Sequence, residues 1–126
     1  MIQPQTDLST PISFLVENQP SEIIFETQLL EAIDDILSGL GDVNKQAIYR
    51  HLKNYYGINE NEIPYEIKDF ARAIEKIFGP VAKLLEIKIV ERLHAKYKDF
   101  LYTPKNGELN FVEFAYSLQK YLELET

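Results

Sequence analysis

The sequence predicts an all-α fold, a compact orthogonal bundle of five to six helices with one long central helix at about residues 80–101. Apolar residues recur at intervals of three and four along most of the chain, which is the period of an amphipathic helix. Glycine and proline fall between these stretches, where helices commonly end and begin. The apolar fraction of 45% and the charged fraction of 26% are typical of a globular protein.

The first part of the chain contains two expected helix starts. Thr10 and Pro11 could open a short helix, and Ser21 is expected to cap the next one. Gly39 and Gly41 end this second helix. Its apolar stripe consists of Leu29, Leu30, Ile33, Ile36, Leu37 and Leu40.

Two further helices are expected before residue 80. One begins at Asp42 and ends at Gly57, because glycine readily adopts the left-handed conformation that often follows a helix. Residues 59–62 form a polar connection. Pro64 then starts a helix that Gly79 ends. The apolar stripe of this helix consists of Ile63, Ile67, Phe70, Ile74 and Ile77.

The stretch at residues 80–101 has apolar residues on most of its sides, which places it at the centre of the bundle or in an oligomer interface. A turn follows, and a short strand is allowed at residues 108–109. Asn110 and Glu113 have the spacing of a capping box and start a last helix. The stripe of that helix consists of Phe111, Phe114, Ala115, Leu118, Tyr121 and Leu122.

The length of the chain, without a linker long enough to divide it, predicts one domain over residues 1–126. Its core is expected at residues 29–101, with residues 1–28 and 102–126 packed on that core. The sequence contains no cysteine, which excludes disulfides and thiolate chemistry. The residues after Met1 show neither the basic region nor the long apolar region of a signal peptide. No apolar run approaches the ~20 residues of a membrane-spanning helix. We therefore expect a cytoplasmic protein without a membrane helix.

Charge is segregated along the chain, whose formal net charge is −7. Residues 1–44 carry eight acids and no lysine or arginine, whereas residues 45–105 carry twelve bases and eight acids. The acidic segment could lie against the basic one within one fold or between two copies. The alternative is a solvated acidic face that keeps the protein in solution.

Six sequence segments carry a resemblance to a known family. They are LLEAIDDILSGLG, KQAIYRHLKNYYGI, EIP and the decapeptide FARAIEKIFG, followed by VAKLLE and IVERL. Over about residues 29–93 their order resembles the archaeal Nitrosopumilus output domain, fifth type. The resemblance implies a small helical output or interaction module without an assigned catalytic residue, so it carries over no functional residue.

No set of residues predicts catalysis or metal binding. The segment 102–113 resembles a calcium loop, but Tyr102 and Pro104 stand where two oxygen ligands are needed. His51 and His94 have no second histidine or carboxylate at a metal-binding spacing. The glycines form no phosphate loop. We therefore expect no enzyme, metal, cofactor or small-molecule substrate.

The expected helix at residues 44–57 offers an alternative function. It carries Lys45, Arg50 and Lys53, which can contact phosphates, and a glycine-containing turn precedes it, as in a helix-turn-helix. The alternative is therefore an acidic DNA-binding regulator. The sequence pI of about 4.8 argues against nucleic acid as a partner, because DNA affinity depends on clustered positive charge.

The preferred prediction is a non-catalytic regulatory or protein-interaction module, a signal-output part of an archaeal-type system. Its partner would be another protein, a second copy, or both. Tyrosine is enriched at protein interfaces, and this chain contains eight tyrosines. The candidate interaction surface is Tyr49, Arg50, Lys53, Tyr55, Tyr56, Tyr116 and Tyr121.

Overall fold

A computed structural model describes residues 21–125, and over this range it is all-α with no strand. The predicted fold class is confirmed. The expected helix start at Thr10 and Pro11 lies outside the described residues. In chain order the elements are α2 (Ser21–Ser38), α3 (Asp42–Tyr56), the 3₁₀ helix η1 (Glu60–Tyr65), α4 (Ile67–Phe78), the 3₁₀ turn η2 (Gly79–Val81), α5 (Ala82–Lys96) and α6 (Phe111–Glu125).

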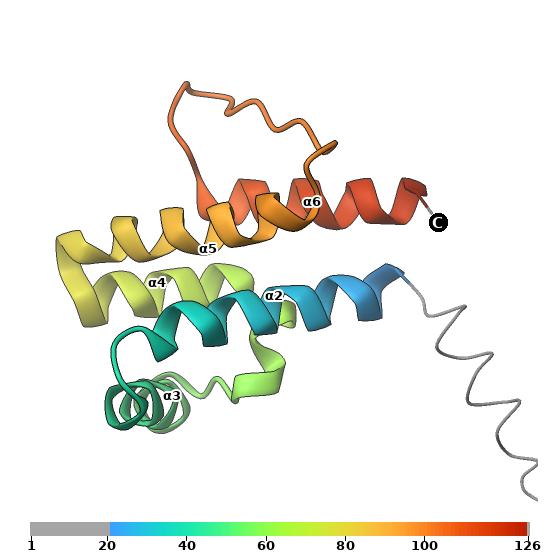
Figure 1. Cartoon of the computed structure of the whole chain (residues 1–126). Coiled ribbons are helices and arrows are strands. Elements are labelled where there is room, and N and C mark those ends of the chain that lie inside the picture. The colour runs from blue at the N-terminus through green and yellow to red at the C-terminus, as the bar shows by residue number, and fades with distance from the viewer. Residues whose placement is uncertain (1–20, 126) are drawn as a thin grey trace, which may run out of the picture.

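Four helices lie lengthwise beside one another and one crosses them. In Figure 1, α2, α4, α5 and α6 run across the view, whereas α3 is seen end-on. Helix α2 contacts α3, η1, α5 and α6, and α5 also contacts α4 and α6. None of the helices in this part of the chain is both long and apolar enough to cross a membrane.

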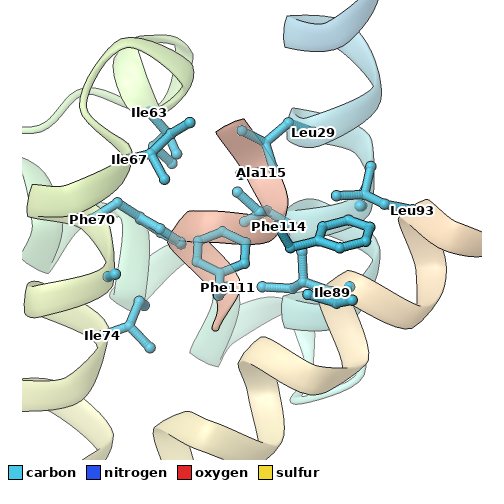
Figure 2. Packing of buried hydrophobic residues seen from close by; sticks show 14 of the residues in the cluster. Leu29, Ile63, Ile67, Phe70, Ile74, Ile89, Leu93, Phe111, Phe114 and Ala115 are labelled. Carbon is cyan, nitrogen blue, oxygen red and sulfur yellow. The ribbon is translucent and has the colours of Figure 1, made fainter. Parts of the chain in front are cut away.

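One hydrophobic core joins the elements from α2 to α6. Figure 2 shows Phe111 and Phe114 of α6 projecting among side chains of α2, α4 and α5, with Phe70 of α4 opposite Phe111. The ring centroids of Phe70 and Phe111 are 6.2 Å apart. The buried stripes of α4 and α6 follow the predicted periods, apart from Ile77 and Tyr121, which are only half-buried.

The helix expected at residues 80–101 is shorter at both ends, since α5 spans Ala82–Lys96. Pro80 lies in η2 rather than in the α-helix. At the other end the chain leaves the helix after Lys96, and Phe100 turns back against α6. Its ring centroid lies 5.5 Å from that of Phe114 and 5.1 Å from that of Tyr121. Burial of Phe100 against α6 therefore competes with helical continuation.

The connections also differ in detail from the expectation. Gly57 has φ 68° and ends α3 as predicted. The polar connection expected at residues 59–62 contains the start of η1. Glu62 Oε1 stabilises this start, because it accepts hydrogen bonds from the backbone and side-chain nitrogens of Asn59 at 3.2 and 2.9 Å. Residues 108–109 form no strand. Asn110 caps α6, as its Oδ1 accepts the Glu113 N–H at 2.9 Å.

Within the acidic segment, helix α2 lies against the basic middle of the same chain. Acidic side chains of α2 form ion pairs with basic side chains of α3 and α5. The pairs are Asp34–Lys45 at 3.2 Å, Asp35–Arg92 at 2.6 Å and Glu31–Lys96 at 3.1 Å. For α2, the segregated charge is therefore matched within one chain, and it needs no second copy to explain it.

Candidate functional site

The seven residues of the predicted interaction surface do not form one surface. Five of them lie on α3, whereas Tyr116 and Tyr121 lie on α6. These two helices make no contact with each other. In Figure 1, α3 lies at the bottom of the bundle and α6 at the top.

Tyr49 belongs to the core rather than to a contact surface. Its side chain is buried, and its hydroxyl donates a hydrogen bond to Asp34 Oδ1 at 3.0 Å. Burial, this hydrogen bond and the charge of Asp34 raise the pKa of Tyr49 far above its usual value of 10.0. Tyr121 is half-buried against Phe100.

The other α3 residues of the predicted surface lie on two sides of the helix. Arg50 and Lys53 line a shallow hollow together with Asn59 and Glu60. Tyr55 is 74% exposed and packs against the ring of His51, with 4.5 Å between the ring centroids. His51 faces a different hollow, described next.

An open groove lies between α3 and α4 and has a volume of about 590 Å³. Five of its eight lining residues are apolar. Among these, Leu40 is 37% exposed, Ala47 is exposed, and Ile77 and Phe78 are half-buried. The lining consists of Leu40, Asn44, Ala47, Ile48, His51, Lys76, Ile77 and Phe78.

One lysine, Lys76, lines the groove. Lys76 borders both the groove and a neighbouring hollow of about 210 Å³, which Tyr56 and Arg72 also line. Arg72 pairs with Asp69 on the surface at 3.1 Å. Within residues 21–125, Lys76 has no ion-pair partner. Lys76 is therefore an exposed cation at the groove that is available to an acidic partner.

The histidines lie in two separate hollows. No carboxylate lines the groove that contains His51. His94 lines a second open hollow, of about 670 Å³, with Glu91, Lys98 and Tyr102. Glu91 is the one carboxylate among the residues that line this hollow with His94.

The carboxylate at the twelfth position of the calcium-like loop is engaged by the protein itself. Glu113 Oε1 accepts hydrogen bonds from the Tyr102 hydroxyl at 2.5 Å and from the Lys105 N–H at 3.4 Å. Across residues 21–125, no group of three or more His, Cys, Asp or Glu side chains is arranged to hold a metal ion.

The proposed DNA-reading helix has fewer available cations than its sequence suggests. Lys45 donates hydrogen bonds to Asp34 at 3.2 Å and to Ser38 at 3.0 Å, and its side chain is only 15% exposed. Arg50 and Lys53 are the exposed cations of α3. Two cations provide little counterion release on DNA.

Comparison of the chain with protein-family models, with curated proteins and with solved structures found no match. The resemblance of residues 29–93 to the archaeal output domain therefore stays a prediction.

Sequence reasoning missed two features of this region of the molecule. The first is the open groove, because its lining residues Leu40 and Ile77 belong to predicted apolar stripes, which are expected to face the core. A second feature, the buried carboxylate of Glu86, is visible in the sequence as a single acid within the apolar run from Leu84 to Ile87.

Proposed function

We propose that this protein is a non-catalytic protein-interaction module that binds an amphipathic helix of a partner protein in the groove between α3 and α4. The helix would present an apolar stripe to the groove and acidic residues beside that stripe. The observation that carries this proposal is the open, mainly apolar groove bordered by Lys76.

The apolar lining supports an apolar partner surface. Grooves between helices commonly accept a third helix through side chains at positions i, i+3, i+4 and i+7. Burying the exposed parts of Leu40, Ala47 and Phe78 would contribute roughly 25 cal/mol for each Å² removed from water. The neighbouring Tyr55, which is 74% exposed, extends this surface along α3.

The charge at the groove supports acidic flanks on the partner. Lys76 is unpaired among the described residues, and Arg72 lies one helical turn before it. Charge complementarity mainly increases the association rate and the specificity of such a complex. Three of the five acids of the chain's own acidic helix α2 are held in internal ion pairs, which favours a separate protein over a second copy.

The regulatory part of the proposal rests on the resemblance to the archaeal output domain. An output module transmits a signal by binding another protein, and this agrees with a groove rather than with a catalytic centre. The membership itself and the archaeal system remain part of the proposal.

A pair of synthetic peptides tests the proposed specificity. Both carry the same leucine stripe at helical spacing, and one has glutamate at the flanking positions where the other has lysine. We expect the glutamate peptide to bind more tightly, with a difference that shrinks as salt is added. Fluorescence anisotropy of the labelled peptides measures both affinities.

Two substitutions of alanine by glutamate locate the binding surface. Ala47→Glu places a charge in the groove and should weaken binding about tenfold or more. Ala95→Glu, on an exposed position that lines the hollow around His94, serves as the matched control and should bind normally. The proposal is wrong if Ala95→Glu alone loses binding, if the lysine peptide binds better, or if light scattering shows that a second copy fills the groove.

A further inference from the structure

One face of α5 is left uncovered by the part of the fold that the structure describes. Helix α5 lies between α4 and α6 in Figure 1, and it contacts both of them and α2. On its remaining face, Leu84, Lys88, Glu91 and Ala95 are all exposed, and we call these four residues the outer stripe. Successive members are four, three and four residues apart, so they line one side of the helix. This is the spacing of the seam along which two helices pair in a coiled coil.

The two ends of the outer stripe complement each other. At the first end, Leu84 is 53% exposed, and Val81, one turn before it, is also 53% exposed. At the other end, Ala95 borders the second hollow, of about 670 Å³. The inner wall of this hollow is apolar, because it is formed by the buried side chains of Val90 and Phe114. Each copy of the chain therefore carries an apolar projection and an apolar hollow on one helix.

The charges in the middle of the outer stripe select a direction of pairing. Lys88 and Glu91 form no ion pair within residues 21–125. If two copies paired with their α5 helices parallel, each lysine would face a lysine and each glutamate a glutamate, which is destabilising.

An antiparallel pair removes this conflict. With a twofold axis midway between Lys88 and Glu91, the lysine of each copy faces the glutamate of the other copy. The same register brings Leu84 opposite Ala95 of the other copy, because Leu84 lies four residues before Lys88 and Ala95 lies four residues after Glu91. One register therefore matches both the charges and the apolar ends.

We propose that two copies of this chain form a dimer through antiparallel α5 helices. Leu84 of each copy packs on Ala95 of the other copy and covers the hollow beside it, and two Lys88–Glu91 pairs form between the copies. A contact that uses the same surface on both copies closes at two. This proposal does not depend on the interaction groove, whose lining contains no residue of the outer stripe.

A second copy fits this face better than a different protein. The chain itself supplies the small residue, the hollow and the opposite charges in the matching order, and such complementarity favours one partner and one register. The contact is small, since one helix of 15 residues from each copy buries less than a standard interface of about 1,600 Å². We therefore expect a weak dimer, with a dissociation constant on the order of 100 μM.

Sedimentation equilibrium of the full chain tests the dimer. Between about 10 μM and about 1 mM, a range that spans the expected dissociation constant, the mass should rise from that of a monomer toward that of a dimer. Added salt should weaken the association, since exposed ion pairs are screened. A chain that is still monomeric at about 1 mM, or an assembly that grows beyond two copies, would overturn the proposal.

Charge reversals test the pairing of Lys88 with Glu91. Lys88→Glu alone and Glu91→Lys alone each place like charges opposite each other, so each should weaken the dimer about tenfold or more. The double variant restores opposite charges and should dimerise like the original chain. A mixture of the two single variants should also pair, because the glutamates of one then face the lysines of the other. Failure of the double variant or of the mixture to associate contradicts the proposal.

Cross-linking tests the direction of the helices. The chain contains no cysteine, so Leu84→Cys and Ala95→Cys each introduce a single thiol. In an antiparallel dimer, a short bismaleimide should join the two variants to each other rather than either variant to itself, because the 11 residues between these positions span about 16 Å of helix. Preferential joining of Leu84→Cys to itself would show parallel pairing and overturn the proposal.

Two control variants test where the contact lies. Lys68→Glu, at an exposed position of α4, changes the net charge by the same amount as Lys88→Glu and should leave the dimer intact. Ala47→Glu, in the interaction groove, should leave it intact as well. Loss of the dimer in either control would place the contact outside the outer stripe and contradict the proposal.

Discussion

Two buried polar side chains of this protein differ in whether they find partners. Tyr49 is buried on α3, and its hydroxyl donates to Asp34, which Lys45 also contacts. Glu86 is buried on α5, and one of its oxygens has no partner in the part of the chain that is described. The Tyr49 hydrogen bond offsets the desolvation of its hydroxyl, whereas the ionised form of Glu86 stays uncompensated.

The stability of the protein should therefore depend on pH through Glu86. Because its folded-state pKa is raised above the usual value of 4.5, the neutral acid favours folding, and this contribution is lost as pH rises from about 4.5 through the raised pKa. Glu86→Gln should remove this loss and raise the free energy of unfolding by on the order of 1 kcal/mol at neutral pH. Urea unfolding at about pH 5 and about pH 8 measures the difference.

The Glu91→Gln variant is the control for the pH prediction, since Glu91 lies on the same helix and is exposed. It should change the stability by less than about 0.5 kcal/mol at either pH. A Glu86→Gln variant that retains the full pH dependence of the original chain would contradict the assignment to Glu86.

At the scale of the elements, helix ends follow two kinds of cause. Gly57 ends α3 with φ 68°, a conformation that glycine adopts without strain. The end of α5 after Lys96 has a tertiary cause instead, because Phe100 packs against Phe114 and Tyr121 of α6. Local sequence predicts the first kind of end and not the second.

Substitutions at Gly57 test the local cause. Gly57→Ala should cost roughly 1 kcal/mol, because alanine is strained at positive φ. An added Cβ would meet no atom within 4 Å, so steric overlap does not contribute. Gly57→Asn should cost less, since asparagine tolerates this conformation. Urea unfolding ranks the two variants, and equal losses would exclude the backbone explanation.

At the scale of the whole molecule, α6 closes the core that the other helices leave open. Phe111 and Phe114 insert among α2, α4 and α5 and are almost completely buried (Figure 2). Three ion pairs hold α2 against α3 and α5, but most of these side chains are about half exposed and contribute little. Stability should therefore reside in the apolar core.

A truncation in α6 tests this view of the core. Phe114→Ala should lower the free energy of unfolding by about 3–5 kcal/mol, because it leaves a cavity among three helices. Tyr116→Ala, on a residue of the same helix that is 43% exposed, should cost far less. Chemical unfolding followed by circular dichroism compares the two. Similar losses for both variants would show that α6 does not contribute through Phe114.

The candidate sites were predictable only in part. The predicted surface included Tyr55, which is exposed beside the groove, but it also joined Tyr49 of the core to tyrosines on a distant helix. Tyrosine has the same chemistry in a core margin and on a surface, so residue type alone does not separate the two.

The sequence by itself determined the helical fold, the stripes of α4 and α6, and the ends at Gly57 and Gly79, because apolar period and backbone freedom are local properties. Only the tertiary structure decided where α5 ends, that the stripe residues Leu40 and Ile77 border an open groove, and that one oxygen of Glu86 is buried without a partner among residues 21–125. Each of these outcomes depends on which side chains arrive from another helix, and a helical period says that a face is apolar without saying what covers it.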